Sequence, residues 1–193
     1  TELRYALLWK SFKKTHLNSS AISYTTNEEL KANPPQADIY CSGSDQVWNS
    51  GWNGGLLREF FLDYVPVGKP KYALASSVGM NEFNDAEKQE LRSLLQEFSS
   101  ISVRETSAVD MIKGLGIDNV YAVMDPTLTK DAAFWRKLAT APKHKKPYIL
   151  IYQLGKDHRV DEYAKFMAEK TGMEVVRICI RYDYALRYGK SIL

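Results

Sequence analysis

The sequence predicts an α/β fold built around a parallel β-sheet. Short apolar runs, typical of buried strands, alternate along the chain with amphipathic stretches that are typical of helices. Small and polar residues follow the apolar runs and indicate turns at their carboxyl ends. Parallel strands need right-handed crossovers, so we expect these carboxyl ends to share one edge of the sheet, where open α/β sheets bind ligands.

The order of the elements begins with helices and continues with strands. Hydrophobic spacing predicts an amphipathic helix over residues 1–17 and a short helix over residues 27–30, which Asn33-Pro34-Pro35 ends. Four apolar runs then predict the strands of one sheet, at residues 38–41, 71–79, 101–104 and 120–124.

The segments between these strands supply loops and helices. A long loop rich in glycine and tryptophan covers residues 48–55, and loops of this size are usually functional or mobile. Asn84 and Asp85 are placed to cap the next helix, whose buried side is expected to carry Leu91, Leu94, Leu95 and Phe98. Further helices are predicted at residues 106–113 and 131–138.

A second βαβ unit follows a linker that is rich in proline and lysine. It consists of a strand at 148–152, a helix at 160–170 and a strand at 174–180. The chain also lacks a leading strand and stops soon after a strand, so we expect a fragment. We therefore predict an N-terminal Rossmann-like domain at 1–141 without its first strand, a linker at 142–147, and the beginning of a second Rossmann-like domain at 148–193.

Composition narrows the class of protein. The 193 residues are 45% hydrophobic and 25% charged, which is ordinary globular composition. The net charge of +3 comes without the basic stripe of nucleic-acid-binding proteins, because the one dense basic cluster, residues 143–146, reads as a solvated linker. No signal peptide and no apolar span of membrane length is present, so we expect a cytoplasmic protein without a transmembrane segment.

Cysteine and histidine positions argue against a metal site. Cys41 and Cys179 lie in separate apolar runs, and we predict two buried thiols rather than a disulfide. His16, His144 and His158 show no metal-ligand spacing, so no metal is predicted.

The first candidate site follows the apolar run 39–41. The turn that begins Gly43-Ser44-Asp45-Gln46 places hydroxyl, carboxylate and amide groups at a strand end. Asp45 would act as a general base or hold a sugar hydroxyl, or else cap a helix. Gln46 and Asn49 would contact hydroxyls or satisfy loop backbone, and Trp48 and Trp52 would stack on a sugar or pack the loop.

Two further strand ends carry candidate residues. Ser76, Ser77 and Gly79 end the second strand, and we expect backbone or hydroxyl contacts to a ligand there, because no histidine or nucleophile elbow accompanies the serines. Arg104 lies between a strand and a helix, where it would bind a phosphate or carboxylate or pair with Glu105 or another carboxylate. Neither the GxGxxG nor the Walker phosphate loop is present, which argues against a dehydrogenase or a kinase.

Asp125-Pro126 ends the fourth predicted strand. The carboxylate of Asp125 would face the crevice at the strand ends, or else initiate the turn before Thr127.

Several motifs in a fixed order resemble the polysaccharide pyruvyl transferase family over about residues 20–185. They are Asp38-Ile39-Tyr40, Gly43-Ser44-Asp45-Gln46-Val47-Trp48-Asn49, Phe61-Leu62-Asp63-Tyr64-Val65, Lys71-Tyr72-Ala73-Leu74-Ala75-Ser76-Ser77-Val78-Gly79, Ile101-Ser102-Val103-Arg104-Glu105 and Met124-Asp125-Pro126-Thr127-Leu128. The resemblance implies one half of a two-domain fold similar to the GT-B glycosyltransferases. It also implies transfer of the pyruvyl group of phosphoenolpyruvate onto a sugar of a bacterial cell-wall or exopolysaccharide unit, as a ketal.

The resemblance also implies roles for residues and partners. Arg104 would bind the phosphate or carboxylate of the donor, and the cleft would be lined by Gly43, Ser44, Asp45, Gln46, Ser76, Ser77 and Gly79. Asp45 is the sole catalytic candidate in these residues. Phosphoenolpyruvate is a substrate, so no cofactor is implied, and the acceptor is a sugar or a lipid-linked saccharide, with peripheral membrane association possible.

One departure from the family bears on activity. The family's histidine motif of the second domain, of the Ser-Phe-His-Gly or Arg-Leu-His type, does not occur here, so we expect these residues alone to be inactive. Two other functions stay open: a nucleotide-sugar glycosyltransferase of the same architecture, and a non-catalytic carbohydrate-binding module that uses the loop at 48–55.

Overall fold

A computed structural model describes residues 2–141, 144–153, 155, 157–178 and 190–192 of the chain. They fall into two compact units. One unit is Ser19–Leu138, and the other joins Thr1–Asn18 to Ala139–Leu193. The boundaries that we predict from the sequence stay a prediction, and each unit is described by itself.

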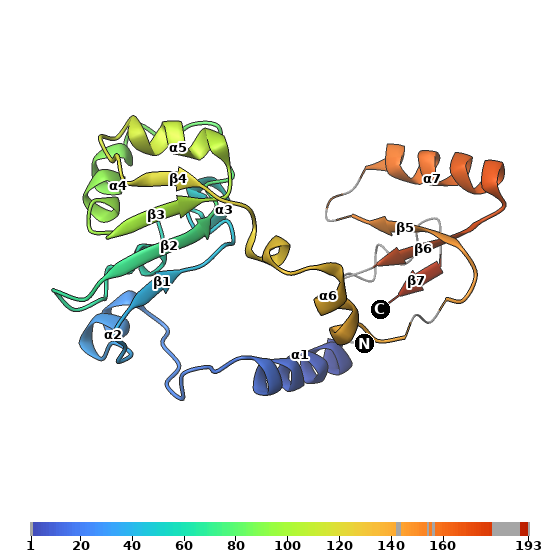
Figure 1. Ribbon diagram of the computed structural model, residues 1–193, viewed down its shortest axis with the longest axis horizontal. Coiled ribbons are helices and arrows are strands. Elements are labelled where there is room, and N and C mark those ends of the chain that lie inside the picture. The colour runs from blue at the N-terminus through green and yellow to red at the C-terminus, as the bar shows by residue number, and fades with distance from the viewer. Residues whose placement is uncertain (1, 142–143, 154, 156, 179–189, 193) are drawn as a thin grey trace. The chain divides into compact units, whose positions relative to one another are not determined.

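The unit Ser19–Leu138 is built on a four-stranded parallel sheet in the order β1-β2-β3-β4. The strands are β1 (Tyr40–Ser42), β2 (Lys71–Ser76), β3 (Ser100–Val103) and β4 (Val120–Ala122). The predicted parallel α/β arrangement is therefore confirmed, and it is consistent with a Rossmann-like half. The arrowheads of the four strands in Figure 1 point to one edge of the sheet, beside which α3 lies.

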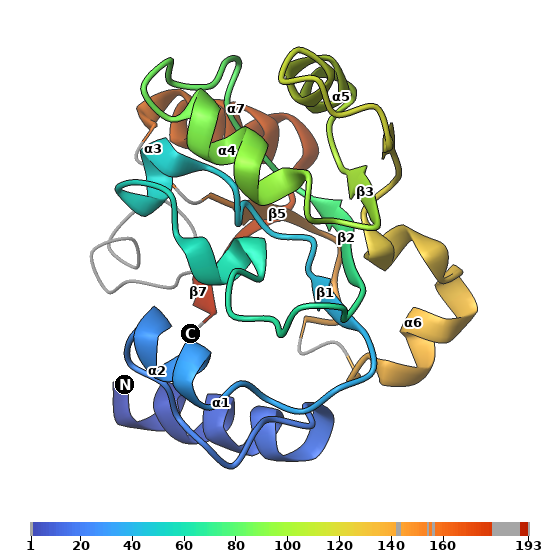
Figure 2. The same cartoon turned by 90° about the vertical axis from the view of Figure 1, so that its left-hand side faces the viewer.

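Helices precede, connect and follow the strands of this unit. They are α2 (Asn27–Ala32), α3 (Ser50–Asn53), the 3-10 helix η1 (Arg58–Phe61), α4 (Lys88–Leu95), α5 (Thr106–Lys113), the 3-10 helix η2 (Pro126–Thr129) and α6 (Ala132–Leu138). Figures 1 and 2 show α4 and α5 together on one side and α2 beyond β1 on the other. The expected buried stripe of α4 is present, because Leu91, Leu94, Leu95 and the following Phe98 are all buried.

The cap that we predict for α4 is wrong. The side chain of Asn84 accepts a hydrogen bond from the Ala86 N–H (3.1 Å), which fixes a turn, and the helix begins only at Lys88. Glu87 holds the N-cap position without a side-chain capping bond, and its carboxylate accepts from the Ser50 hydroxyl instead (2.7 Å). The carboxylate at the N-cap position of α4 is therefore engaged in a tertiary hydrogen bond to Ser50 and does not cap the helix.

Trp48 forms the aromatic centre of the core. Its side chain is 2% exposed, stacks on Phe61 with 5.5 Å between the ring centroids, and meets Phe98 edge-on at 5.8 Å. The indole N–H donates to the Phe60 carbonyl (3.2 Å), which also accepts from the Ser42 hydroxyl (2.8 Å). Trp48 therefore packs the loop against the domain, and only Trp52 is left as a sugar-stacking candidate.

The other unit contains a three-stranded parallel sheet in the order β5-β6-β7. Its elements are α1 (Glu2–His16), β5 (Tyr148–Tyr152), α7 (His158–Thr171), β6 (Glu174–Ile178) and β7 (Lys190–Ile192). Helix α7 packs against β5 and β6, as Figure 1 shows. Gly172 ends α7 in the left-handed region (φ 68°), a conformation that favours glycine.

A buried arginine marks the interior of this unit. Arg177, on β6, is 1% exposed, and its guanidinium pairs with the carboxylate of Asp161 on α7. It also donates to the Gln153 side chain (2.9 Å). In the sequence Arg177 lies inside an otherwise apolar strand run, and no local pattern indicates its partner on α7.

Two expectations about exposure are wrong. The helix at the start of the chain forms as α1, but residues 6–16 are all exposed, so the apolar side chains among these residues make no buried face. Cys41 is exposed rather than buried, because it lies between the buried residues Tyr40 and Ser42 and alternation along a strand turns it to the other face. Cys179 lies outside the described residues. Within the described residues, no helix is both long and apolar enough to cross a membrane.

Candidate functional site

An irregularity in β2 shapes the carboxyl end of the sheet. Ala75 is fully buried and has a left-handed backbone (φ 51°), and the register of β2 against β3 shifts between Ala73 and Ser76. The Ser102 hydroxyl accepts from the Ala75 N–H (3.0 Å) and donates to the Ala73 carbonyl (2.8 Å). A left-handed non-glycine residue costs about 1–2 kcal/mol, and the Ser102 hydroxyl bonds offset part of that cost.

The bulge aims two serines at the turn that follows β1. The hydroxyl of Ser76 donates to the Gly43 carbonyl (3.0 Å), and the N–H of Ser77 donates to the Asp45 carbonyl (3.0 Å). Both serines are fully buried. They therefore hold the turn at Gly43–Asp45 in place.

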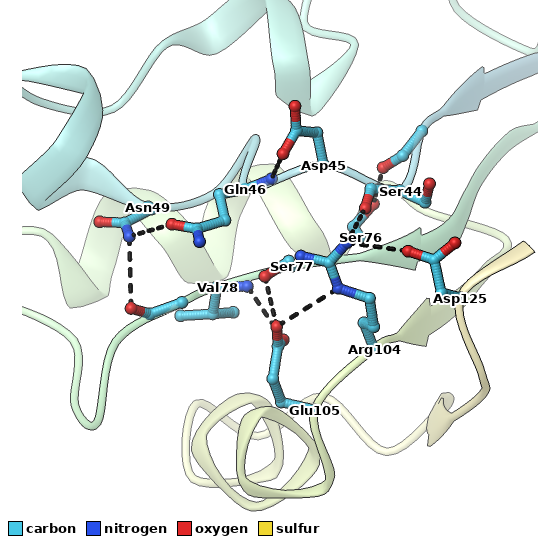
Figure 3. A network of polar contacts seen from close by, with 12 residues as sticks. Ser44, Asp45, Gln46, Asn49, Ser76, Ser77, Val78, Arg104, Glu105 and Asp125 are labelled. Carbon is cyan, nitrogen blue, oxygen red and sulfur yellow. Dashed lines mark hydrogen bonds and ion pairs between the residues drawn. The ribbon is translucent and has the colours of Figure 1, made fainter. Parts of the chain in front are cut away.

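Arg104 joins the turn to the ends of β3 and β4. Its Nη1 donates to the Ser44 carbonyl (2.8 Å) and to the carboxylate of Asp125 (3.0 Å), and its Nε lies 3.7 Å from the Glu105 carboxylate (Figure 3). Arg104 therefore pairs with carboxylates of the protein, which is one of the two roles expected from the sequence. It also faces the Gly43 turn, and the other expected role, binding of a ligand anion, stays a prediction. Its side chain is 29% exposed, and Nη2 makes no hydrogen bond within the described part of the chain.

Glu105 links Arg104 to the second strand end. Its carboxylate accepts from the Ser77 hydroxyl and from the Val78 N–H (3.3 Å), as Figure 3 shows. Although Glu105 precedes α5, it makes no side-chain capping bond to that helix. The sequence shows Glu105 only as a possible ion-pair partner of Arg104, because its bonds to β2 depend on strand order that no local pattern reveals.

Asp125 takes both roles that the sequence leaves open. Its Oδ1 accepts from the N–H and the hydroxyl of Thr127 (3.0 and 2.7 Å), which starts η2, while Oδ2 faces Arg104. The bonds from Thr127 and then that from Arg104 hold the pKa of this carboxyl below its usual range. Asp125 therefore stays ionised at neutral pH and sets a negative charge beside the guanidinium.

Asp45 and Gln46 are exposed on the turn. The Asp45 carboxylate accepts from the N–H of Gln46 (2.7 Å), so the prediction that it caps a helix is wrong; the cap of α3 is Asn49. Ser44 is half-buried, and Gly43 is exposed. The turn thus offers one carboxylate and one amide to solvent, at the edge where Arg104 lies.

Asn49 connects the turn with the glycine that follows β2. Its side-chain N–H groups donate to the Gln46 side chain (2.8 Å) and to the Gly79 carbonyl (3.3 Å). Gly79 has a φ of 61°, and a Cβ built on it would lie 2.6 Å from Oε1 of Gln46 and 2.8 Å from Nδ2 of Asn49. Glycine is therefore favoured here by the backbone conformation, and a side chain at this position would displace the ends of the Gln46 and Asn49 side chains.

The variant Gly79→Ala tests this packing. We expect it to lower the free energy of unfolding by about 1–3 kcal/mol more than the same substitution at another left-handed glycine does, because the added methyl group would displace the side chains of Gln46 and Asn49. Gly68→Ala is the matched control, since Gly68 has a φ of 85° with open space around its Cβ position. Urea unfolding curves of both variants measure the difference, and equal losses would contradict the close packing.

The site residues that the sequence predicts therefore meet at one edge of one sheet. Hydrogen bonds, made directly or through a single residue, connect five of them: Gly43, Ser44, Ser76, Ser77 and Arg104. Gly79 joins through Asn49. Within the described residues, no three histidine, cysteine, aspartate or glutamate side chains gather as metal ligands would, and the prediction that no metal binds stays a prediction.

An α/β protein with a polar cluster at the carboxyl edge of a parallel sheet falls in the large class of proteins that bind small ligands at strand ends. A comparison with protein families narrows this class. The family model described as polysaccharide pyruvyl transferase matches residues 3–193, and the chain belongs to this family. This confirms the family resemblance and the transferase class. No curated protein and no solved structure matched the chain. The GT-B-like arrangement of two domains stays a prediction.

Proposed function

We propose that this chain takes part in moving the pyruvyl group of phosphoenolpyruvate onto a sugar, where it forms a ketal. In this reaction the methylene carbon of the donor gains a proton, two sugar hydroxyl oxygens bond to the neighbouring carbon, and the bond from that carbon to the phosphate oxygen breaks. The hydroxyls lose two protons, of which one balances the proton gained by the methylene carbon and the other leaves with inorganic phosphate. The donor carries a phosphate and a carboxylate, so its site needs cationic or N–H partners. The family of the chain supports the reaction class.

The observation that carries the proposal is the position of Arg104. Its guanidinium is fixed against the Ser44 carbonyl, at the edge formed by β1, β3 and β4, while Nη2 still offers its donors. The two N–H groups of Nη2 are suited to donate to phosphate or carboxylate oxygens. The carboxylates of Asp125 and Glu105 offset the charge of the guanidinium and weaken its attraction for an anion, so the donor would have to be held by direct hydrogen bonds from Nη2.

The exposed turn supports contacts to the sugar. Asp45 and Gln46 present a carboxylate and an amide to solvent, and these groups suit sugar hydroxyls. Ser76 and Ser77 are buried with their hydroxyls bonded to protein groups, so in this proposal they position the turn and Glu105 without touching the substrate.

The experiment is a calorimetric titration of the chain with phosphoenolpyruvate and, separately, with a nucleoside diphosphate. We expect saturable binding of phosphoenolpyruvate at millimolar concentration and none of the nucleotide. Binding of the nucleotide alone would favour a nucleotide-sugar glycosyltransferase and overturn the proposal. We expect no phosphate release by these 193 residues on their own when a sugar is added, because the histidine motif is missing from their sequence.

A further inference from the structure

Trp52 is the most exposed of the tryptophans, with 82% of its side chain in solvent, although Trp48 on the same loop is 2% exposed. A single exposed apolar residue is common on protein surfaces and by itself indicates nothing. Two further observations distinguish Trp52: the rigidity of the segment that carries it and the depression beside that segment.

The backbone under Trp52 is fixed at both ends. Its N–H donates to the side chain of Asn49 (2.9 Å), which caps α3, and Gly54 ends that helix in the left-handed region (φ 75°). The side chain of Asn53 donates to the Val47 carbonyl (3.2 Å). The indole is therefore held out into solvent by a rigid turn, which reduces the entropy that a ligand would have to overcome.

The same asparagine joins Trp52 to the candidate site. Asn49 accepts from the Trp52 N–H and donates to Gln46 and to the Gly79 carbonyl. Trp52 is thus one residue removed from the exposed turn that carries Asp45 and Gln46, which Figure 3 shows beside Asn49.

A polar depression of about 540 Å³ adjoins the segment. Its lining comes from α3 and from the loop that leads to α4: Ser50, Gly51, Met80, Glu82, Phe83, Asn84, Asp85 and Glu87. The volume is within the range of small-molecule sites. Three carboxylates line it, and among them Glu87 accepts from the Ser50 hydroxyl (2.7 Å) and Asp85 pairs with Lys88.

We propose that Trp52 and this depression bind the acceptor saccharide. The indole face stacks on the C–H face of a sugar ring, and Glu82, Asp85 and Asn84 accept hydrogen bonds from its hydroxyls. The carboxylates repel a sugar that carries an acid group, so the ligand is an uncharged or amine-bearing saccharide. This inference rests on the proposed function, because it assigns that reaction's acceptor.

The test is a titration of the chain with glycosides in the absence of phosphoenolpyruvate, in which tryptophan fluorescence reports binding. The probes are the methyl β-glycosides of glucose, galactose, mannose and N-acetylglucosamine, together with methyl β-glucuronide, which differs from the glucoside by its acid group. We expect at least one uncharged glycoside to bind saturably and the glucuronide to bind about tenfold more weakly or not at all.

The variant Trp52→Ala is expected to lose about tenfold in affinity for the binding glycoside. Trp9→Ala is the control, because Trp9 is also an exposed indole (52%) but lies in the other unit, and its variant should bind like the wild type. Because the Trp52 variant loses one reporter, its affinity is also measured by calorimetry. Circular dichroism verifies that each variant is folded.

Three results would overturn the proposal: no binding of any uncharged glycoside, unchanged binding by the Trp52 variant, or equal binding of the glucuronide. Failure of this proposal and failure of the proposed function are distinguishable. If phosphoenolpyruvate binds but no glycoside binds, only the proposed acceptor site is overturned. If a glycoside binds but phosphoenolpyruvate does not, the proposed transfer reaction is overturned and the result indicates a carbohydrate-binding module.

Discussion

Replacing Arg104 with glutamine is expected to weaken the binding of phosphoenolpyruvate by about tenfold to hundredfold. Hydrogen bonds to a charged group contribute about 1.5–3 kcal/mol, and glutamine removes both the charge and the planar fork. Calorimetric titration of both proteins measures the change.

Two variants separate charge from a general loss of structure. Arg104→Lys keeps the charge without the fork and should bind between the wild type and Arg104→Gln. Arg58→Gln is the matched control, because Arg58 also pairs with two carboxylates, Asp63 and Glu90, away from the candidate site. Equal affinity in the wild type and Arg104→Gln, or an equal loss in Arg58→Gln, would show that Arg104 does not bind the donor.

Replacing Asp161 with asparagine is expected to destabilise the β5–β7 unit by about 3–5 kcal/mol, the range for removing one partner of a buried ion pair. Arg177 is 1% exposed and the Asp161 side chain is 18% exposed, so the substitution takes the Asp161 carboxylate away from a buried guanidinium. Hydrogen exchange of β5, β6 and α7 measures this unit separately from the other. The amides of these elements should exchange much faster, while those of β1–β4 keep their protection.

Two further variants show whether charge is responsible. Asp157→Asn breaks the exposed pair with Arg159, but asparagine still caps α7, so exchange should change little. Asp161→Leu combined with Arg177→Met removes both charges, and it should recover most of the protection that Asp161→Asn loses. If Asp161→Asn exchanges like Asp157→Asn, the buried pair does not stabilise the unit.

Local signals explain which elements were predicted well. The helix Thr106–Lys113 and the strand Tyr148–Tyr152 match their predicted bounds, because apolar periodicity and flanking glycine or proline define both. The bulge at Ala75 has no such signal, since the surrounding residues are typical of a continuous strand and the left-handed backbone is stabilised by a tertiary bond from the Ala75 N–H to the Ser102 hydroxyl. Strand β7 (Lys190–Ile192) consists of the last three described residues and was not predicted.

The location of the candidate site could be predicted from the sequence, but most of its side-chain contacts could not. Small and polar residues after β1 and β2 indicate an edge, and parallel order brings Ser44 and Arg104 together there. The direction of each side chain is not encoded locally. Ser76 and Ser77 point into the protein, toward the Gly43 carbonyl and Glu105, because the bulge in β2 turns them inward.

The most direct test of the account is a proton–nitrogen correlation spectrum of the arginine Nε–H groups during a titration with phosphoenolpyruvate. The signal of Arg104 is assigned by its loss in Arg104→Gln, and that of Arg58 by its loss in Arg58→Gln. Our account predicts that the Arg104 signal shifts and saturates at the concentration that calorimetry gives, while the Arg58 signal stays in place. Saturable binding of phosphoenolpyruvate with an unmoved Arg104 signal would contradict it.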